Sequence, residues 1–246
     1  MFGLEGRQAL VTGAGQHAGA GVAQALASRG ARVLVNDLIA DRAEAVAAGI
    51  TASGGDAAAV AFDVTVIAEV TSALAAVGPV DILVNNAGNG GAAGMVPKPF
   101  SEMAVGEWMG PIEVNLFGVI HCVHAVIGPM IERRWGRIIT ISSGAGTDGV
   151  GIGVAPYSAG KGGALGFMRS LALENAYKGV TANSVALGLM SNVGNADVVA
   201  ALAMAVPAKR LGTPGDVAAA CVYLASDEAS WVTGQTLGVN GGSSTS

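Results

Sequence analysis

The stretch Gln8-Ala9-Leu10-Val11-Thr12-Gly13-Ala14-Gly15-Gln16-His17-Ala18-Gly19 decides the fold of this chain. It begins with an apolar run of strand length and continues as a glycine-rich turn. Residues 20–29 then predict a helix and residues 31–35 a second strand, which together make a βαβ unit of the dinucleotide-binding type. Glycines let the backbone approach a pyrophosphate, whose charge is met by the N–H groups and dipole of the helix N-terminus. We therefore expect cofactor contacts at Gly13, Gln16, His17 and Gly19.

The second strand leads into an acid, Asp37. A carboxylate at this place accepts hydrogen bonds from an adenosine ribose diol and repels a 2′-phosphate. The neighbouring positions that would suit a phosphate-binding cation hold the neutral residues Gln16 and Leu38. These three positions predict NAD(H) as the cofactor. The alternative is that Asp37 is a loop acid or the cap of a helix beginning near Asp41.

Strands and helices alternate along the rest of the chain. Apolar runs predict strands at residues 57–62, 80–84, 137–143, 180–186 and 236–239, and helical patterns lie at 66–77, 105–134, 157–178 and 214–225. The helix at 105–134 is expected to be disturbed near Gly110-Pro111. Residues 89–101 read as a loop over the site. The fold class is therefore α/β, a single-domain Rossmann-type doubly wound parallel sheet with helices on both faces, spanning residues 1–246.

A tyrosine and a lysine, Tyr157 and Lys161, are spaced by one helical turn and share a helix face. Free tyrosine and lysine have pKa values near ~10 and ~10.4, so neither is a base at neutral pH. A nearby cation favours the phenolate, so we expect Lys161 to lower the pKa of Tyr157 toward working pH. Ser143 ends a buried strand and brings a hydroxyl to its carboxyl end, where open α/β sheets keep their sites.

Composition excludes several classes of protein. Of the 246 residues 51% are apolar and 13% charged, the net charge is −5, and no basic run is present, which argues against a nucleic-acid partner. No uninterrupted apolar stretch of ~20 residues and no signal-peptide pattern is evident, so we expect no membrane span. Cys122 and Cys221 lack metal-ligand spacing and read as reduced, buried residues of a cytoplasmic protein. His121 and His124 have no carboxylate or cysteine partners, and no metal site is expected.

Taken together, these residues resemble the classical short-chain dehydrogenases/reductases from Thr12 to Gly242. The resemblance rests on motifs in a fixed order: Thr12-Gly13 with Gly19, Asp63-Val64, Asn85-Asn86-Ala87-Gly88, Asn115, Ser143, Tyr157 with Lys161, Arg210-Leu211-Gly212, Asp216-Val217-Ala218, Thr233-Gly234-Gln235, and Val239-Asn240-Gly241-Gly242.

The resemblance implies a role for each matched residue. Tyr157 would exchange a proton with the substrate oxygen, and Ser143 would hydrogen-bond that oxygen. Lys161 would act on the tyrosine and bind the nicotinamide ribose, and Asn115 would hold a water that relays protons. The remaining implied cofactor contacts are Asp63, Val64, Asn86, Ala87, Gly88, Gly188 and Asn192. A homotetramer built on the helices of Asn115 and Tyr157 is also implied.

The chain departs from the family pattern at three positions. His17 stands where the family has glycine; histidine tolerates left-handed backbone better than most residues, and its side chain would either crowd or contact the pyrophosphate. Leu187 replaces a proline beside the nicotinamide, which would loosen the substrate mouth. Asn192 replaces a threonine and retains both donor and acceptor.

The substrate is expected under a loop at about residues 189–209. Met95, Val96, Met190 and Val193 are candidates for the pocket wall, and no arginine is placed to clamp an anionic group. We therefore expect an NAD(H)-dependent enzyme acting on a neutral, fairly apolar ketone or secondary alcohol. The alternative is a 3-oxoacyl reductase acting on carrier-protein or coenzyme A thioesters, for which Arg133, Arg134 and Lys178 would dock an acidic carrier. A lyase or a non-catalytic binder on the same scaffold are further alternatives.

Overall fold

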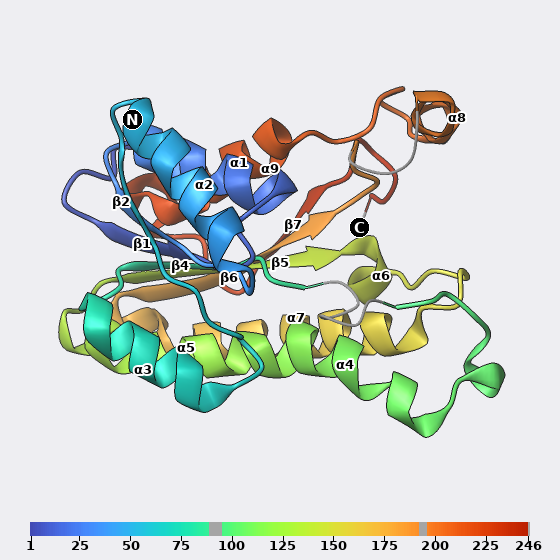
Figure 1. Ribbon diagram of the computed structural model, residues 1–246, viewed down its shortest axis with the longest axis horizontal. Helices are drawn as coiled ribbons and strands as arrows, with labels where there is room; N and C mark the ends of the chain where they lie inside the picture. The colour runs from blue at the N-terminus through green and yellow to red at the C-terminus, as the bar shows by residue number, and fades with distance from the viewer. Residues whose placement is uncertain (89–94, 192–195, 246) are drawn as a thin grey trace.

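One parallel sheet forms the centre of the molecule (Figure 1). The computed structural model describes residues 1–88, 95–191 and 196–245. The seven strands lie in the order β3-β2-β1-β4-β5-β6-β7, and every neighbouring pair is parallel. In chain order the strands are β1 (Gln8–Val11), β2 (Arg32–Val35), β3 (Asp56–Ala59), β4 (Ile82–Asn85), β5 (Gly136–Ser143), β6 (Val180–Leu187) and β7 (Thr236–Val239).

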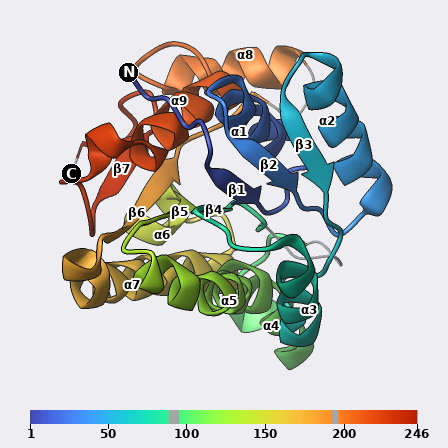
Figure 2. The ribbon, with the colours of Figure 1, turned by 90° about the vertical axis from the view of Figure 1, so that its left-hand side faces the viewer.

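Helices cover both faces of the sheet, as predicted (Figures 1 and 2). On one face lie α1 (His17–Ser28), α2 (Ala40–Ala52) and α9 (Pro214–Ala225); on the other lie α3 (Ile67–Val77), α5 (Gly118–Glu132) and α7 (Ala155–Asn175). Shorter helices are α4 (Met109–Ile112), α6 (Gly144–Thr147) and α8 (Ala196–Ala205). A π-helical segment, η3 (Glu113–Phe117), separates α4 from α5. The doubly wound Rossmann-type fold predicted from the sequence is therefore confirmed.

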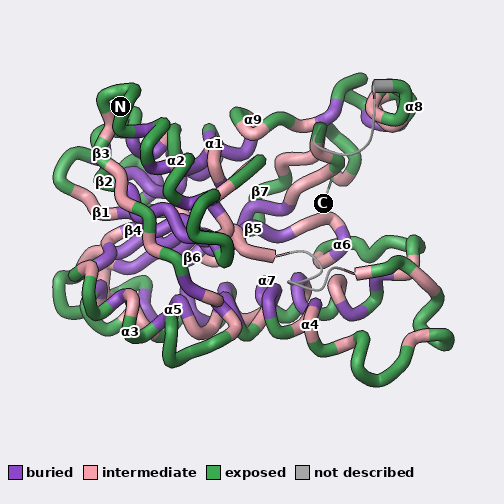
Figure 3. Tube along the Cα trace, in the orientation of Figure 1, coloured by how far each residue is buried: buried purple, intermediate pink, exposed green. Residues whose placement is uncertain are grey.

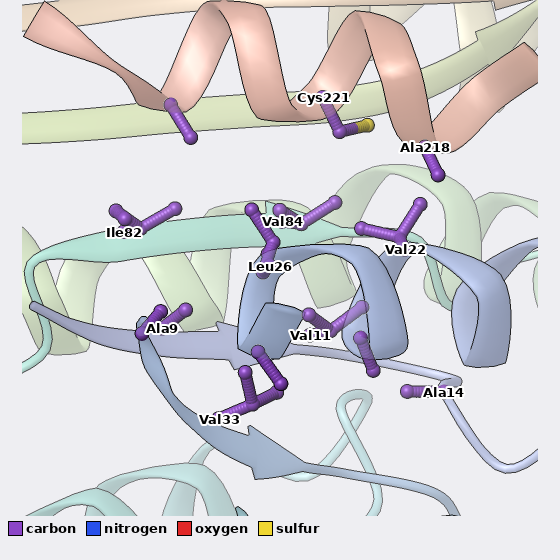
Figure 4. Close-up of a cluster of buried hydrophobic side chains, with 14 of the residues drawn as sticks. Ala9, Val11, Ala14, Val22, Leu26, Val33, Ile82, Val84, Ala218 and Cys221 are labelled. Atoms are coloured by element: carbon purple, nitrogen blue, oxygen red, sulfur yellow. The ribbon is translucent and has the colours of Figure 1, made fainter. Parts of the chain in front are cut away.

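Alternate residues of each strand serve the two faces of the sheet because strand side chains point to opposite sides. Ala9 and Val11 of β1 belong to the cluster packed under α1, α2 and α9, whereas Leu10 belongs to the cluster on the opposite face. Figure 4 shows Ala9 and Val11 beside Val33, facing the helix that carries Leu26. In Figure 3 the five inner strands are largely buried, whereas the edge strands β3 and β7 and the outer helix surfaces are intermediate or exposed. Both sides of a parallel sheet are thus covered, as parallel pairing requires.

Several element boundaries differ from prediction. β3 ends at Ala59 rather than residue 62, and β4 is Ile82–Asn85 rather than residues 80–84. β6 continues to Leu187, one residue beyond the predicted end, because leucine can remain in a ladder where proline would end it. The helix α1 starts at His17 rather than residue 20, since the glycine-rich turn is tighter than assumed. α8, within the predicted substrate loop, had not been anticipated.

A membrane-spanning helix must be long and apolar. The described part of the chain contains one such helical stretch, Val105–Glu132. Interior helices of α/β domains pass the same test, and this stretch packs against α7, α3 and the sheet.

Candidate active site

A cavity of about 2000 Å³ opens at the carboxyl ends of the strands. This is the edge at which open α/β sheets bind ligands. It is lined by these predicted residues: Gly13, Gln16, His17, Gly19, Asp37, Asp63, Val64, Asn86, Ala87, Gly88, Met95, Val96, Ser143, Tyr157, Lys161, Gly188 and Met190. Asn192 and Val193 lie outside the described residues. The structure thus brings nearly all the predicted site residues to one place.

The glycine-rich turn is packed tightly against the end of β4. Gly13 has φ 59°, and a Cβ there would lie 2.8 Å from the Ala87 Cα. A Cβ on Gly19 would collide with the Gly13 carbonyl oxygen. The Asn86 side-chain amide donates to the carbonyl oxygens of Thr12 and Gly13, at 3.0 and 2.9 Å. Positions 13 and 19 of the glycine-rich turn therefore admit only glycine, and this glycine cradle allows the close approach of a pyrophosphate.

His17 occupies left-handed backbone, with φ 48°, a conformation that histidine tolerates better than most residues. It is the first residue of α1, is exposed, and lines the cavity. Gln16, at the N-cap, makes no side-chain capping hydrogen bond. The N–H groups of the first turn therefore remain available to a ligand.

The Asp37 carboxylate is almost fully buried at the end of β2. One oxygen accepts the N–H of Gly15 at 3.1 Å, and the other accepts the N–H of Ile39 at 3.0 Å. A carboxylate has about four acceptor sites, so these bonds leave capacity for a ribose diol. Asp37 does not cap α2, whose N-cap is Ile39.

Arg42 is a cavity residue that the sequence analysis missed. A Cβ on Gly15 would lie 2.6 Å from both the Arg42 Cβ and an Asp37 oxygen, so the two charged residues flank the same glycine. The sequence could have indicated Arg42, because it lies in the first turn of the helix after β2, and residues of that turn face the same strand ends as Asp37.

The next strand end supplies Asp63 and Val64. The Asp63 carboxylate accepts both the backbone N–H and the hydroxyl of Thr65, at 2.8 Å each. Val64 is buried, and its carbonyl oxygen lies 3.0 Å from Nδ1 of His121. His121 is therefore a satisfied structural histidine, in agreement with the sequence interpretation.

Ser143 and Tyr157 meet at the centre of the cavity wall. Ser143 is the last residue of β5, and its Oγ accepts the Ala145 N–H at 3.2 Å. Burial raises the pKa of Tyr157 above its ordinary value, and a hydrogen bond with Ser143 acts in the lowering direction. The two hydroxyl groups thus already interact.

Lys161 is buried one turn further along α7, with 5% of its surface exposed. Its Nζ donates to the Ile141 carbonyl oxygen at 2.7 Å and lies 5.9 Å from the centre of the Tyr157 ring. Burial lowers the pKa of Lys161 to about 8. The expectation that Lys161 lowers the pKa of Tyr157 is wrong for this structure, because burial dominates both groups and the ammonium is directed at a backbone carbonyl.

Asn115 lies behind the cavity wall, fully buried in the π-helical segment η3. Its side-chain amide donates to the Pro111 carbonyl oxygen at 2.7 Å, the oxygen that a regular helix would pair with the Asn115 backbone N–H. The disturbance predicted at Gly110-Pro111 thus falls one turn later. A Cβ on Gly88 would lie 2.7 Å from the Asn115 Oδ1 and 2.8 Å from the Lys161 Nζ, so both polar groups converge on that glycine.

The cavity wall also contains a group of apolar residues, together with charged ones such as Glu107 and Asp148. The apolar residues of this lining include Met95, Val96, Pro97, Val150, Ile152, Leu189 and Met190. Val96 and Ile152 remain 76% and 66% exposed, although they are large apolar side chains. The Lys98 ammonium, also in this lining, is paired with Glu107 at 2.7 Å.

The fold and the site together define a class of protein. A doubly wound sheet, a glycine cradle followed by an acid, and a buried lysine next to a Ser–Tyr pair are the features of nicotinamide-dependent oxidoreductases. A family model described as "short chain dehydrogenase" matches residues 7–202. The chain belongs to the classical short-chain dehydrogenase/reductase family and is an oxidoreductase that acts on CH–OH or keto groups with a nicotinamide cofactor.

Individual relatives cover nearly the whole chain. The chain is 42% identical to the 3-oxoacyl-[acyl-carrier-protein] reductase FabG of Escherichia coli over 97% of its length and 98% of that protein. It resembles the structure of a gluconate 5-dehydrogenase from Burkholderia cenocepacia in complex with NADP and tartrate, with TM-score 0.89, 34% identity, and coverage of 98% and 96%. It also resembles a 7α-hydroxysteroid dehydrogenase complexed with NADH and 7-oxo glycochenodeoxycholic acid, with TM-score 0.89, 35% identity, and coverage of 98% and 95%.

Proposed function

We propose that the chain is an NAD(H)-dependent oxidoreductase that interconverts a neutral, fairly apolar secondary alcohol and its ketone. The observation that carries this proposal is the convergence of Tyr157, Ser143 and Lys161 on one cavity with Asp37. In the oxidation, the substrate carbon loses a hydride and its oxygen loses a proton. Bound nicotinamide supplies the hydride acceptor.

Residues of the chain transfer the proton and orient the substrate and the cofactor. Tyr157 takes the proton as its phenolate, and in the reduction its phenol, whose pKa is raised by burial, gives the proton back. Ser143 holds the substrate oxygen through the hydroxyl that contacts Tyr157. Lys161 binds the nicotinamide ribose with an ammonium group fixed by the Ile141 carbonyl. Asn115 positions the water through which protons leave, next to Lys161 at Gly88.

The preference for NAD(H) rests on Asp37. Its carboxylate lies in the cavity with remaining acceptor capacity, and a 2′-phosphate beside it would meet charge repulsion. Arg42 acts in the opposite direction, because a guanidinium binds phosphate well. Since relatives of this chain bind NADP in one structure and NADH in another, we propose NAD(H) as the preferred cofactor with measurable use of NADP(H).

The apolar lining supports the substrate class. The exposed valine, isoleucine and leucine side chains of the cavity lining lose water contact when an apolar ligand covers them. Met95, Met190 and Val193 are proposed as the substrate wall, and residues 189–209 as the loop that covers it. Lys98, a cation of the cavity lining, is paired with Glu107, and Asp148 adds a further carboxylate, which disfavours anionic substrates.

A 3-oxoacyl thioester reductase is the second candidate, favoured by the 42% identity to such an enzyme. The basic residues considered for carrier docking do not support it. Arg133 and Arg134 precede β5 and Lys178 precedes β6, so they lie at the opposite edge of the sheet from Ser143, a strand length of about 23 Å away. Their side chains bond to Asp81, the Tyr177 carbonyl and Asn175.

Several further properties are proposed with this function. We propose a cytoplasmic homotetramer that binds neither nucleic acid nor membrane. Phe117, the last residue of η3, and Leu173 of α7 are large apolar residues with 41% and 82% exposure, which supports self-association.

The test is a panel assay that follows NADH and NADPH absorbance with apolar ketones, polyol-derived ketones and 3-oxoacyl thioesters. The proposal expects the highest kcat/KM with NADH and an apolar ketone. The best rate with a 3-oxoacyl thioester would favour the second candidate. Failure to bind NADH by fluorescence would favour a lyase or a non-catalytic binder on this scaffold.

A further inference from the structure

His17 combines two unfavourable features in one place. Of the non-glycine residues with positive φ in the described part of the chain, which are Phe2, His17, Arg134 and Lys209, His17 is the one that lines the cavity. Left-handed backbone brings a Cβ too close to the following carbonyl oxygen, whereas glycine adopts it freely. The chain therefore keeps a strained side chain where glycine would relieve the strain.

The second unfavourable feature is electrostatic. α1 is 12 residues long, and its N-cap residue Gln16 provides no side-chain acceptor. The first turn contains no acidic residue, so the positive end of the helix dipole is uncompensated. A protonated imidazole at this end is repelled by the dipole unless an anion lies between them. A pyrophosphate at the glycine cradle is such an anion.

Other charged groups do not already neutralise this site. The elements packed against α1 are α9, β2, β1 and α2. β1 carries no titratable residue, and Asp37, which follows β2, directs its oxygens at Gly15 and Ile39. On α9, Asp216 is paired with Arg210 at 2.7 Å. The remaining titratable residues of these elements are Arg32, Asp41, Arg42, Glu44, Cys221 and Tyr223. None of these side-chain types ordinarily changes charge between pH 6 and 7.5, whereas histidine does.

We propose that His17 is a cofactor-binding residue whose imidazolium supplies positive charge to the dinucleotide pyrophosphate, so that cofactor affinity rises as pH falls. This inference rests on the proposed use of a dinucleotide. It assigns a function to a side chain at a position where a glycine suffices for the turn.

The test compares NADH dissociation constants, measured by fluorescence at pH 6.0 and 7.5, for the wild type and His17→Gly. The wild type should bind roughly fourfold more tightly at pH 6.0, the change expected if the cofactor raises the proton affinity of one histidine about tenfold. His17→Gly should lose this pH dependence and bind more weakly at pH 6.0. Because glycine relieves the strained backbone, the variant should also melt at a higher temperature without cofactor, which separates lost binding from lost folding.

His124→Gln is the matched control, since His124 is an exposed histidine on α5. It should keep the pH dependence of the wild type. Equal pH dependence in the wild type and His17→Gly, or tighter binding by His17→Gly at both pH values, would overturn the inference while leaving the proposed function intact. Absence of NADH binding by the wild type at both pH values would instead overturn the proposed function.

Discussion

Replacing Lys161 with methionine should abolish turnover and, at neutral pH, relieve a folding cost. The pKa of this buried amine falls from its ordinary value of 10.5 to about 8 because burial disfavours the charged form. That difference corresponds to a cost of about 3 kcal/mol at pH 7. The Ile141 carbonyl oxygen would lose its 2.7 Å hydrogen bond, a loss of about 1 kcal/mol or somewhat more. The net expectation at pH 7 is a variant about 1–2 kcal/mol more stable than the wild type.

The pH dependence gives the sharper form of this prediction. Below pH 8 the lysine is protonated in both the folded and the unfolded chain, so the full cost of the buried charge is present. Between pH 8 and 10.5 the unfolded chain binds more protons than the folded one, and the stability of the wild type rises with pH. The variant lacks this rise, so its advantage should shrink by about 2 kcal/mol between pH 7 and 9.5.

The assay is urea unfolding followed by tryptophan fluorescence at pH 7, 8, 9 and 9.5, at one protein concentration because oligomers unfold in a concentration-dependent way. Burial raises the pKa values of Cys122 and Cys221 to about 12, which makes stability fall as pH rises. Both proteins share this effect, and it cancels in their difference. Lys178→Met, at a less buried lysine, is the control and should follow the wild type.

Two results would refute the reasoning about Lys161. One is a stability difference between wild type and Lys161→Met that stays constant from pH 7 to 9.5. The other is unimpaired turnover by the variant.

The other predictions concern the remaining groups of the cavity. Tyr157→Phe should lower kcat at least 1000-fold while NADH affinity, measured by fluorescence, stays within about threefold, and near-normal turnover would exclude Tyr157 as the proton-transfer group. Asp37→Asn, which keeps an acceptor for the Gly15 N–H, should narrow the preference for NADH over NADPH about tenfold; a wild type that strongly prefers NADPH would contradict this. Arg42→Ala should weaken NADPH binding about tenfold or more and leave NADH binding nearly unchanged, whereas Arg32→Ala, at the opposite end of β2, should change neither. Equal losses for both cofactors would show that Arg42 contacts a shared part of the dinucleotide.

Much of the fold could be predicted because short apolar runs in the sequence indicate the strands without knowledge of the tertiary structure. The apolar runs at 8–11, 137–143 and 236–239 are the observed strands within one residue. Burial explains the apolar runs of β1 and β5, which are largely buried, whereas the edge strand β7 is mostly exposed. Ser143 and Tyr157 were placed in one site because a strand end and the following helix meet at the same edge of the sheet.

The errors concern properties that depend on three-dimensional surroundings. Spacing alone placed Lys161 on the same helix face as Tyr157, but it carried no information on burial, which reverses the expected direction of the tyrosine pKa. Arg42 was missed because its approach to Gly15 depends on how α2 packs over β2. The helix disturbance predicted at Gly110-Pro111 is observed one turn later, as the π-helical segment Glu113–Phe117, where the Asn115 side chain donates to the Pro111 carbonyl oxygen.

Unfavourable local features gather at the same edge of the sheet. His17 has left-handed backbone, Asn115 sits in a π-helical turn, and Lys161 buries an amine. Selection for stability alone would disfavour them, because glycine relieves the backbone strain at position 17, a regular helical turn restores the backbone hydrogen bonds at Asn115, and an apolar side chain at position 161 should stabilise the protein despite the lost Ile141 hydrogen bond. Their presence around one cavity therefore indicates selection for ligand binding and proton transfer. It follows that His17→Gly and Lys161→Met should each stabilise the protein while impairing function, and that the same kinds of change at His124 and Lys178 should do neither.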